Sequence, residues 1–122
     1  MRGYRDLETW HRAMKLVKAV YIATRQFPRD ELYGLTSQLR RAAVSIPSNI
    51  AEGCGRNSRK ELHYFLGQAR GSLAEVETQL EIAKDLGYLT SESKAALLAD
   101  AAQLGRMLTG LRAWSAKEDA GD

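Results

Sequence analysis

Apolar positions recur along this chain at alternating steps of three and four residues, the spacing that lines one face of an α-helix. Four such segments occur, over about residues 7–26, 31–53, 59–86 and 91–116. No segment shows a convincing two-residue alternation of the kind that marks a half-buried strand. The pattern predicts one all-α domain, residues 1–122, built from four amphipathic helices.

Each helix has an expected core face. In the first helix it is Leu7, Trp10, Met14, Val17 and Tyr21, and in the second Leu32, Leu35, Leu39, Ala42, Ile46 and Ile50. In the third it is Leu62, Leu66, Ala69, Leu73, Val76, Leu80 and Ala83, and in the fourth Leu97, Ala101, Leu104, Leu108 and Leu111. Helices joined by turns of a few residues can bury four such faces only in an antiparallel up-down-up-down bundle.

Signals for helix ends accompany these faces. Asp6 is a candidate N-cap of the first helix, and Phe27-Pro28 ends it, because the residue before a proline avoids helical angles. Ser58 and Glu61 fit a capping box, and Gly87 fits a left-handed stop. Thr90 or Ser91 opens the last helix.

The second helix runs through Pro47 without a change of phase in its apolar stripe. Proline donates no backbone hydrogen bond, and its ring presses on the carbonyl of the residue four positions earlier. We therefore expect a helix that is kinked at Pro47 and held by packing from outside.

Composition places the chain among soluble globular proteins. Apolar residues make up 44% and charged residues 27% of its 122 positions, and its apolar runs are too short to cross a bilayer. The start of the chain lacks the hydrophobic stretch of a secretory signal. Cys54 is the one cysteine, so no intrachain disulfide can form, and a cytoplasmic location is expected.

Charge is modest overall, with a formal net charge of +3, but the expected topology separates it along the bundle. One end would gather Arg2, Arg5, Arg56, Arg59, Lys60 and Arg112. The other would carry Asp30, Glu81, Asp85 and Glu92. Two interpretations stay open, a site for an acidic partner such as nucleic acid and a polar end that is merely solvated.

The turn over residues 53–58 places two glycines and an arginine just before a helix N-terminus, where free backbone donors favour an anion. The alternative is a helix C-cap followed by an N-cap, which needs no ligand. No nucleotide-binding spacing surrounds this turn, and no nucleophile signature surrounds Cys54.

Enzymatic chemistry finds little support. Glu8 and His11 have the Glu-x-x-His spacing that di-iron carboxylate bundles use on two of their helices. A second copy is missing, because the residue three positions before His63 is Lys60 and not a glutamate. The two histidines fit surface or boundary positions. We assign no catalytic, cofactor or metal residue and expect no small-molecule substrate.

Two helix faces are unusually small or polar. One is formed by Gly67, Gly71, Ala74 and Thr78, and the other by Gln38, Arg41, Ser45, Ser48 and Glu52. Small residues allow close approach of backbones. We expect Gln38, Ser45, Ser48, Gly67, Gly71 and Ala74 to contact neighbouring subunits, and the alternative is a tight crossing inside the bundle.

Three segments carry a resemblance to a known family: DLETW, FPRDELYGLTSQLRRAAVSIPSNIAEGCGR and LGQARGSLAEVETQLEIAKDLGYL. They resemble the four-helix-bundle proteins encoded in 23S rRNA intervening sequences, over about Tyr4 to Thr90. That family is in turn similar to the accessory variability proteins of diversity-generating retroelements, which are pentameric barrels that engage nucleic acid. The resemblance implies a homopentamer without enzymatic activity and carries no catalytic residues over.

The first hypothesis for function is a non-enzymatic oligomeric scaffold that binds structured RNA or an RNA–protein complex, with DNA as a further possible partner. The expected contacts are Arg40, Arg41, Arg56, Arg59 and Lys60. The second hypothesis is a protein–protein interaction module that binds no nucleic acid, and a small hydrolase or metal enzyme is a distant third. Pairing of the basic residues with Glu52, Glu61 or Glu75 would favour the second hypothesis.

Overall fold

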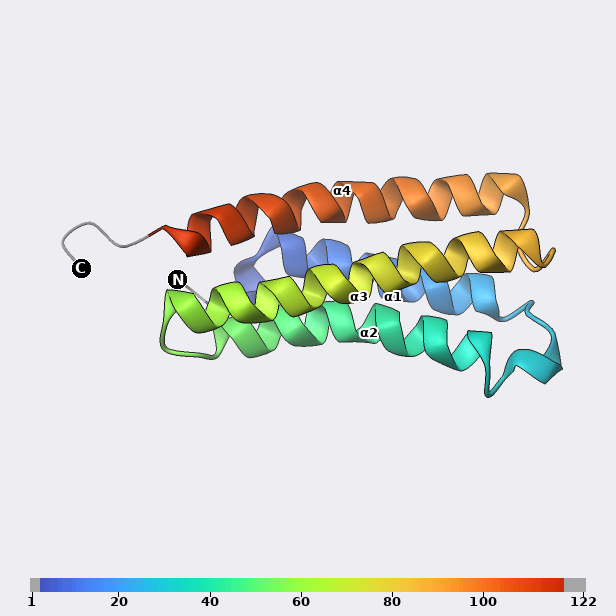
Figure 1. Ribbon diagram of the computed structural model, residues 1–122, viewed down its shortest axis with the longest axis horizontal. Coiled ribbons are helices and arrows are strands. Elements are labelled where there is room, and N and C mark those ends of the chain that lie inside the picture. The colour runs from blue at the N-terminus through green and yellow to red at the C-terminus, as the bar shows by residue number, and fades with distance from the viewer. Residues whose placement is uncertain (1–2, 118–122) are drawn as a thin grey trace.

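The structure is a computed structural model that describes residues 3–117, and four long helices make up most of it. They are α1 (Glu8–Thr24), α2 (Leu35–Cys54), α3 (Arg59–Asp85) and α4 (Ser91–Ala116). The colour gradient in Figure 1 runs back and forth along the molecule, so successive helices point in opposite directions. The all-α four-helix bundle predicted from the sequence is confirmed.

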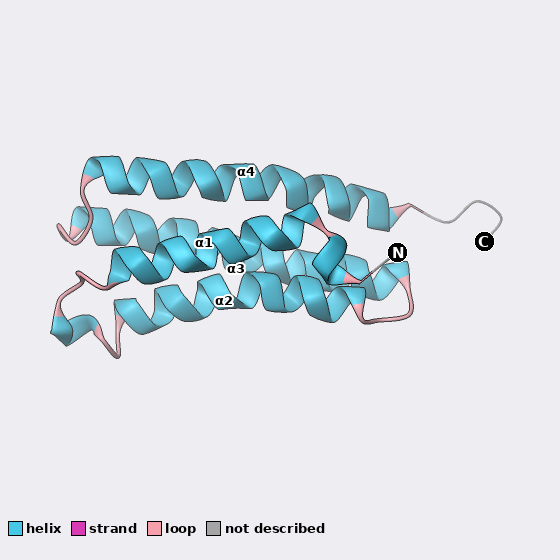
Figure 2. Cartoon of the chain, turned by 180° about the vertical axis from the view of Figure 1, so that it is seen from behind, coloured by secondary structure: helices cyan, strands magenta, loops and turns pink. Residues whose placement is uncertain are grey.

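Each helix packs against two neighbours. Close backbone contacts join α1 with α2, α2 with α3, α3 with α4 and α4 with α1, and within residues 3–117 the backbones of the two diagonal pairs stay further apart. The start of α1, the α2–α3 turn and the end of α4 therefore share one end of the molecule (Figures 1 and 2). No helix in this part of the chain has the length and apolar character needed to cross a membrane.

The core faces of α3 and α4 follow the sequence pattern closely. All seven predicted positions of α3 are buried, as are Leu97, Ala101, Leu104 and Leu108 of α4. Leu111, the last predicted position, is half-buried and packs on the edge of the core. Steps of four and three keep these side chains on one stripe over the whole length of both helices.

The predicted core face of α1 is wrong by about one residue. Its buried positions are Thr9, Ala13, Leu16, Val20 and Thr24. Tyr21, which we expected in the core, is 40% exposed. The buried face is not evident from the sequence because two of its residues, Thr9 and Thr24, are polar. Thr24 can be buried because its hydroxyl donates to the Val20 carbonyl at 2.8 Å.

The larger side chains of the predicted α1 face flank the core instead. Trp10, Met14 and Val17 are half-buried and line a hollow of about 290 Å³ between α1 and α2. Val44 and Pro47 form part of its other wall. The apolar surface of α1 is therefore wider than one helix seam, and part of it faces solvent.

The second helix begins at Leu35, four residues later than the predicted residue 31. A short 3₁₀ helix, η2 (Arg29–Glu31), precedes it, and Leu32 is 49% exposed instead of buried. The Glu31 carboxylate accepts the Leu35 N–H at 3.0 Å and the Tyr88 hydroxyl at 2.9 Å. These two hydrogen bonds lower the pKa of Glu31, and the contact with Glu31 raises the pKa of Tyr88.

The helix termini mostly agree with the sequence signals. Ser58 accepts the Glu61 N–H at 3.1 Å, Thr90 accepts the Ser93 N–H at 3.0 Å, and Gly87 has a left-handed φ of 81°. Asp6 is not the N-cap of α1. It belongs to a 3₁₀ turn, η1 (Tyr4–Asp6), and Leu7 occupies the capping position.

Helix α2 continues through Pro47, whose side chain is buried. Ile46 and Ile50 on either side are fully buried, so packing holds the helix where a hydrogen bond is missing. The bend at Pro47 stays a prediction.

Candidate nucleic-acid interface

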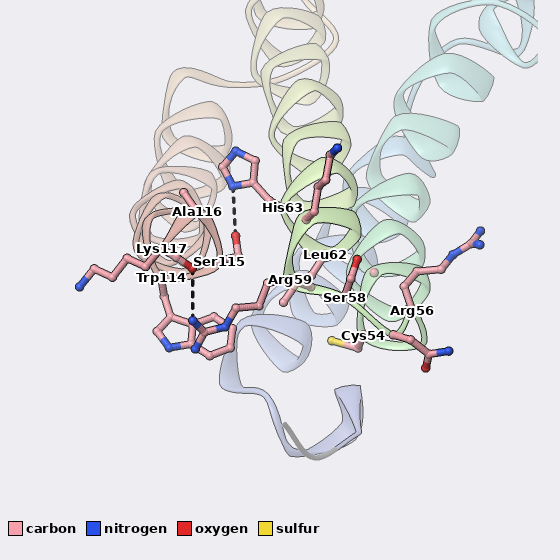
Figure 3. Close-up of a pocket in the computed structure, with 13 residues that line it drawn as sticks. Cys54, Arg56, Ser58, Arg59, Leu62, His63, Trp114, Ser115, Ala116 and Lys117 are labelled. Carbon is pink, nitrogen blue, oxygen red and sulfur yellow. Dashed lines mark hydrogen bonds between the residues drawn. The ribbon is translucent and has the colours of Figure 1, made fainter. Parts of the chain in front are cut away.

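A hollow of about 990 Å³ lies where the α2–α3 turn meets the last turn of α4 (Figure 3). We refer to it as the end pocket. It is lined by Gly53, Cys54, Arg56, Asn57, Ser58, Arg59, Lys60, Leu62, His63, Trp114, Ser115, Ala116 and Lys117. Within the part of the chain that the structure describes, four of the lining residues are lysine or arginine and none is acidic. The lining therefore favours an anionic occupant.

Arg59 and Trp114 form a cation–π contact in the end pocket. The Arg59 guanidinium lies 3.9 Å from the centre of the Trp114 ring, and its Nη1 donates to the Lys117 carbonyl at 3.3 Å. Figure 3 shows the two side chains stacked beside the end of α4. Trp114 keeps 38% of its surface exposed, so the pocket presents an aromatic ring next to a planar cation.

Arg56 and Lys60 contribute charge in different ways. Arg56 pairs with Glu52 at 3.1 Å and lies over the Phe65 ring at 5.1 Å, and in Figure 3 it points away from Trp114. Both members of that pair are about half exposed, so the pairing screens Arg56 only in part. Lys60 is exposed and has no ion pair among residues 3–117.

The turn before α3 is accounted for by its own hydrogen bonds. Gly55 donates to the Ala51 carbonyl at 3.1 Å, and Arg56 donates to the Gly53 carbonyl at 3.2 Å. A Cβ on Gly53 would lie 3.0 Å from the Phe65 Cβ, so a glycine is needed there for close helix packing. The turn is therefore a helix C-terminus followed by an N-cap, which is the interpretation of the sequence that needs no ligand.

Cys54 sits half-buried at the end of α2. Burial raises the pKa of its thiol, which lowers the fraction of reactive thiolate at neutral pH. This environment is that of a packing residue.

Behind His63, which lines the end pocket, lies a partly buried arginine, Arg112. Arg112 Nη2 lies 3.1 Å from His63 Nε2, and Arg112 has no ion pair within residues 3–117. A guanidinium only donates, so His63 Nε2 accepts and Nδ1 carries the proton, facing the Arg112 carbonyl and Ser115 Oγ at 3.1 Å each. The Arg112 Nε is buried and has no hydrogen-bond partner among the described residues. Arg112 thus adds positive charge behind the pocket surface.

The structure does not bring all five predicted nucleic-acid contacts together. Arg56, Arg59 and Lys60 line the end pocket, but Arg40 and Arg41 lie in the first half of α2, about 20 Å away at 1.5 Å per helical residue. Arg40 donates to Thr24 Oγ1 at 2.8 Å and covers the Tyr21 ring. Arg41 is exposed. Arg2, predicted at the same end as the pocket, lies outside the described residues.

Comparison with known proteins matches residues 5–110 to the 23S rRNA-intervening sequence protein family. The chain belongs to this family. The match covers the first three helices and most of α4. Curated proteins yield no match to the chain. Trp114, in the last turn of α4, and Lys117, directly after the helix, lie beyond the matched residues.

The predicted subunit contacts of this 23S rRNA-intervening sequence protein divide into two groups. Ser45 and Gly67 are used inside the chain: Ser45 Oγ lies 2.8 Å from Ser72 Oγ, and Gly67 faces the Arg112 guanidinium. The others, Gln38, Ser48, Gly71 and Ala74, are exposed. The tight internal crossing therefore explains part of the small-residue pattern, and subunit contacts through the exposed group stay a prediction.

Glu8 and His11, the one Glu-x-x-His pair in the sequence, are both exposed on α1 and contact different partners. His11 Nε2 lies 2.8 Å from the Arg5 carbonyl, and Glu8 pairs with Arg12 at 3.4 Å. Within the described residues, no group of three or more His, Cys, Asp or Glu side chains is placed to hold a metal ion.

Sequence reasoning missed Trp114 and Lys117 as parts of the site. Trp114 lies in the last turn of α4 and Lys117 caps that helix, and the apolar periodicity of the sequence marks neither residue as part of a site. The sequence does carry one signal for them: Trp114 lies outside the leucine stripe of this helix and only three residues before Lys117, so an exposed aromatic ring next to a cation could have been expected.

Proposed function

We propose that this 23S rRNA-intervening sequence protein is a non-enzymatic scaffold that binds RNA through the end pocket. The observation that carries the proposal is the pocket lining, which among residues 3–117 has four basic side chains, an exposed tryptophan and no acidic residue. Phosphate groups supply the matching charge, and lysine and arginine contacts to phosphates dominate the affinity of most nucleic-acid complexes. Arg56, Arg59, Lys60 and Lys117 are the proposed contacts. The cytoplasm, where Cys54 stays reduced, is the proposed location.

We further propose that the protein acts as a homo-oligomer, with five subunits as its resemblance to pentameric bundles suggests. Each chain has a net charge of +3, and several copies of one weak phosphate site act together with high avidity. Exposed small residues on α3 and the apolar hollow lined by Trp10, Val17 and Val44 offer surfaces for assembly. Light scattering at micromolar concentration tests this part, and a monomer mass contradicts it.

A protein–protein interaction module is the second candidate, favoured by one specific observation. Arg56 is paired with Glu52, which is the internal pairing expected if the basic residues serve the fold and not a ligand. Lys60 has no such partner within residues 3–117, and for this reason RNA binding ranks first.

A binding titration at several salt concentrations tests the proposed function. Ribosomal RNA fragments and duplex DNA are the probes, with the purified full chain as the titrant. Binding through phosphates must weaken steeply as salt rises, since each contact releases condensed counterions. Absence of RNA retention in low salt, or binding that does not respond to salt, would favour the interaction module.

A further inference from the structure

We infer that the Trp114–Arg59 pair is a stacking platform for an unpaired nucleobase, so that the end pocket prefers single-stranded nucleic acid. The inference rests on the proposed function and specifies the ligand of the same site. It also goes beyond the family match, because Trp114 follows the last matched residue, 110.

The geometry shows two flat groups placed side by side at an open pocket. The guanidinium of Arg59 lies 3.9 Å from the Trp114 ring centre, which is van der Waals stacking distance. The bond from Arg59 to the Lys117 carbonyl at 3.3 Å holds the guanidinium in place. Both aromatic rings and arginine planes stack on bases in single-strand binding sites. A base entering the pocket meets a platform that is already formed.

The lining around the platform suits the other parts of a nucleotide. Leu62 adds an apolar side chain to the pocket lining, and Lys60 and Lys117 add positive charge to it. A volume of about 990 Å³ leaves room for a base with its sugar and phosphate. An anion without a flat apolar part would leave the exposed tryptophan unused, and a purely apolar ligand would leave the cations unused.

The same geometry predicts that the pocket prefers single strands to duplex. In a duplex, both faces of each base are covered by neighbouring base pairs, so no base is available to the Trp114 ring. An unpaired nucleotide exposes its π-face and needs no unstacking of a helix. The pocket is therefore expected to bind loops, ends or single strands more tightly than duplex.

Binding of fluorescently labelled oligoadenylate tests the inference, compared with an abasic chain of equal length, an RNA duplex and an acidic peptide. Riboadenylate and deoxyadenylate are both used, because stacking is available to either sugar. The wild type is expected to prefer adenylate to the abasic chain by about five- to a hundredfold in at least one sugar form. Trp114→Leu should remove that preference, whereas Trp114→Phe should keep most of it.

Matched controls separate stacking from folding. Tyr33 is 93% exposed in the turn before α2, at the other end of the bundle, so Tyr33→Leu should leave the preference unchanged. Circular dichroism confirms that each variant keeps its helices. The chain has two tryptophans, so Trp10→Phe leaves Trp114 as the sole tryptophan reporter, and its fluorescence should be quenched by adenylate. In the otherwise wild-type chain, Trp114→Phe leaves Trp10 as the sole tryptophan, and its fluorescence should not be quenched by adenylate.

Each adverse outcome identifies what has failed. Equal binding of adenylate and the abasic chain by the wild type overturns base stacking while leaving phosphate binding intact. A preference that survives in Trp114→Leu, or an acidic peptide that binds as tightly as adenylate, also overturns the inference. Failure to bind any nucleic acid contradicts the proposed function itself.

Discussion

Gly67 and Gly71 lie one helical turn apart on α3 and provide a sharp test of the packing around Arg112. A Cβ on Gly71 would have open space, whereas a Cβ on Gly67 would lie 3.1 Å from Arg112 Nη2 and 3.4 Å from its Cζ. Replacing either glycine by alanine removes the same backbone entropy from the unfolded chain. The difference between the two variants therefore reports the Arg112 contact.

Gly71→Ala should raise the free energy of unfolding by about 0.5–1 kcal/mol, the usual advantage of alanine in a helix. Gly67→Ala gains the same amount but requires the Arg112 guanidinium, 3.1 Å from the new Cβ, to shift by a few tenths of an ångström, and we expect this shift to weaken its contact with His63. Losing that 3.1 Å hydrogen bond to a charged group costs about 1.5–3 kcal/mol. We therefore expect Gly67→Ala to be less stable than Gly71→Ala by at least about 1 kcal/mol, with a melting temperature several degrees lower.

Urea denaturation followed by far-UV circular dichroism measures both variants under the same conditions. In an Arg112→Ala background the clash is absent, and the two alanine variants should change stability by the same amount. Equal stability of the two variants in the wild-type background would refute the packing of Arg112 over Gly67.

Three further predictions concern the internal polar contacts and the charge. Ser45→Ala should lower the free energy of unfolding by about 1–3 kcal/mol, because it strands the buried Ser72 hydroxyl, and Ser45→Ala/Ser72→Ala should recover part of that loss; an additive double-mutant cycle would contradict the 2.8 Å contact. Because the folded-state pKa of Glu31 is lowered, its contribution to stability is present above the unfolded pKa and is lost as pH falls through the folded pKa. Glu31→Gln should therefore flatten the acid side of a stability-versus-pH curve measured by urea denaturation, and an unchanged curve would argue against the capping role. Exchanging Glu118, Asp119 and Asp122 for their amides raises the net charge from +3 to about +6 and should tighten RNA binding in low salt; unchanged affinity would show that charge near the end of the chain does not act on the site.

Sequence periodicity predicts the fold well where one side chain type repeats on one face. Leu62, Leu66 and Leu73 mark the buried stripe of α3 without ambiguity, and the cap at Ser58 follows from local chemistry. The α1 face was misplaced because Thr9 and Thr24 are polar in composition but buried in fact. A threonine that bonds its own helix backbone is compatible with burial, and the sequence pattern carries no sign of that bond.

The sequence predicts only those parts of the end pocket whose residues are close to one another along the chain. Arg56, Arg59 and Lys60 share one turn, so their clustering follows from the topology. The stack of Arg59 on Trp114 joins residues 55 positions apart and depends on the rotation of α4, which helix periodicity does not determine. The same holds for Arg112, expected at the basic end but folded against His63 and Gly67.

The salt dependence of RNA binding in two charge-matched variants tests the central claim most directly. Lys60→Gln removes a cation that lines the end pocket, and Arg29→Gln removes one from η2, at the opposite end of the bundle. The slope of log affinity against log salt should become shallower by about one for Lys60→Gln and stay at the wild-type value for Arg29→Gln. Equal slopes for the two variants, or an affinity that does not depend on salt, would contradict nucleic-acid binding at the end pocket.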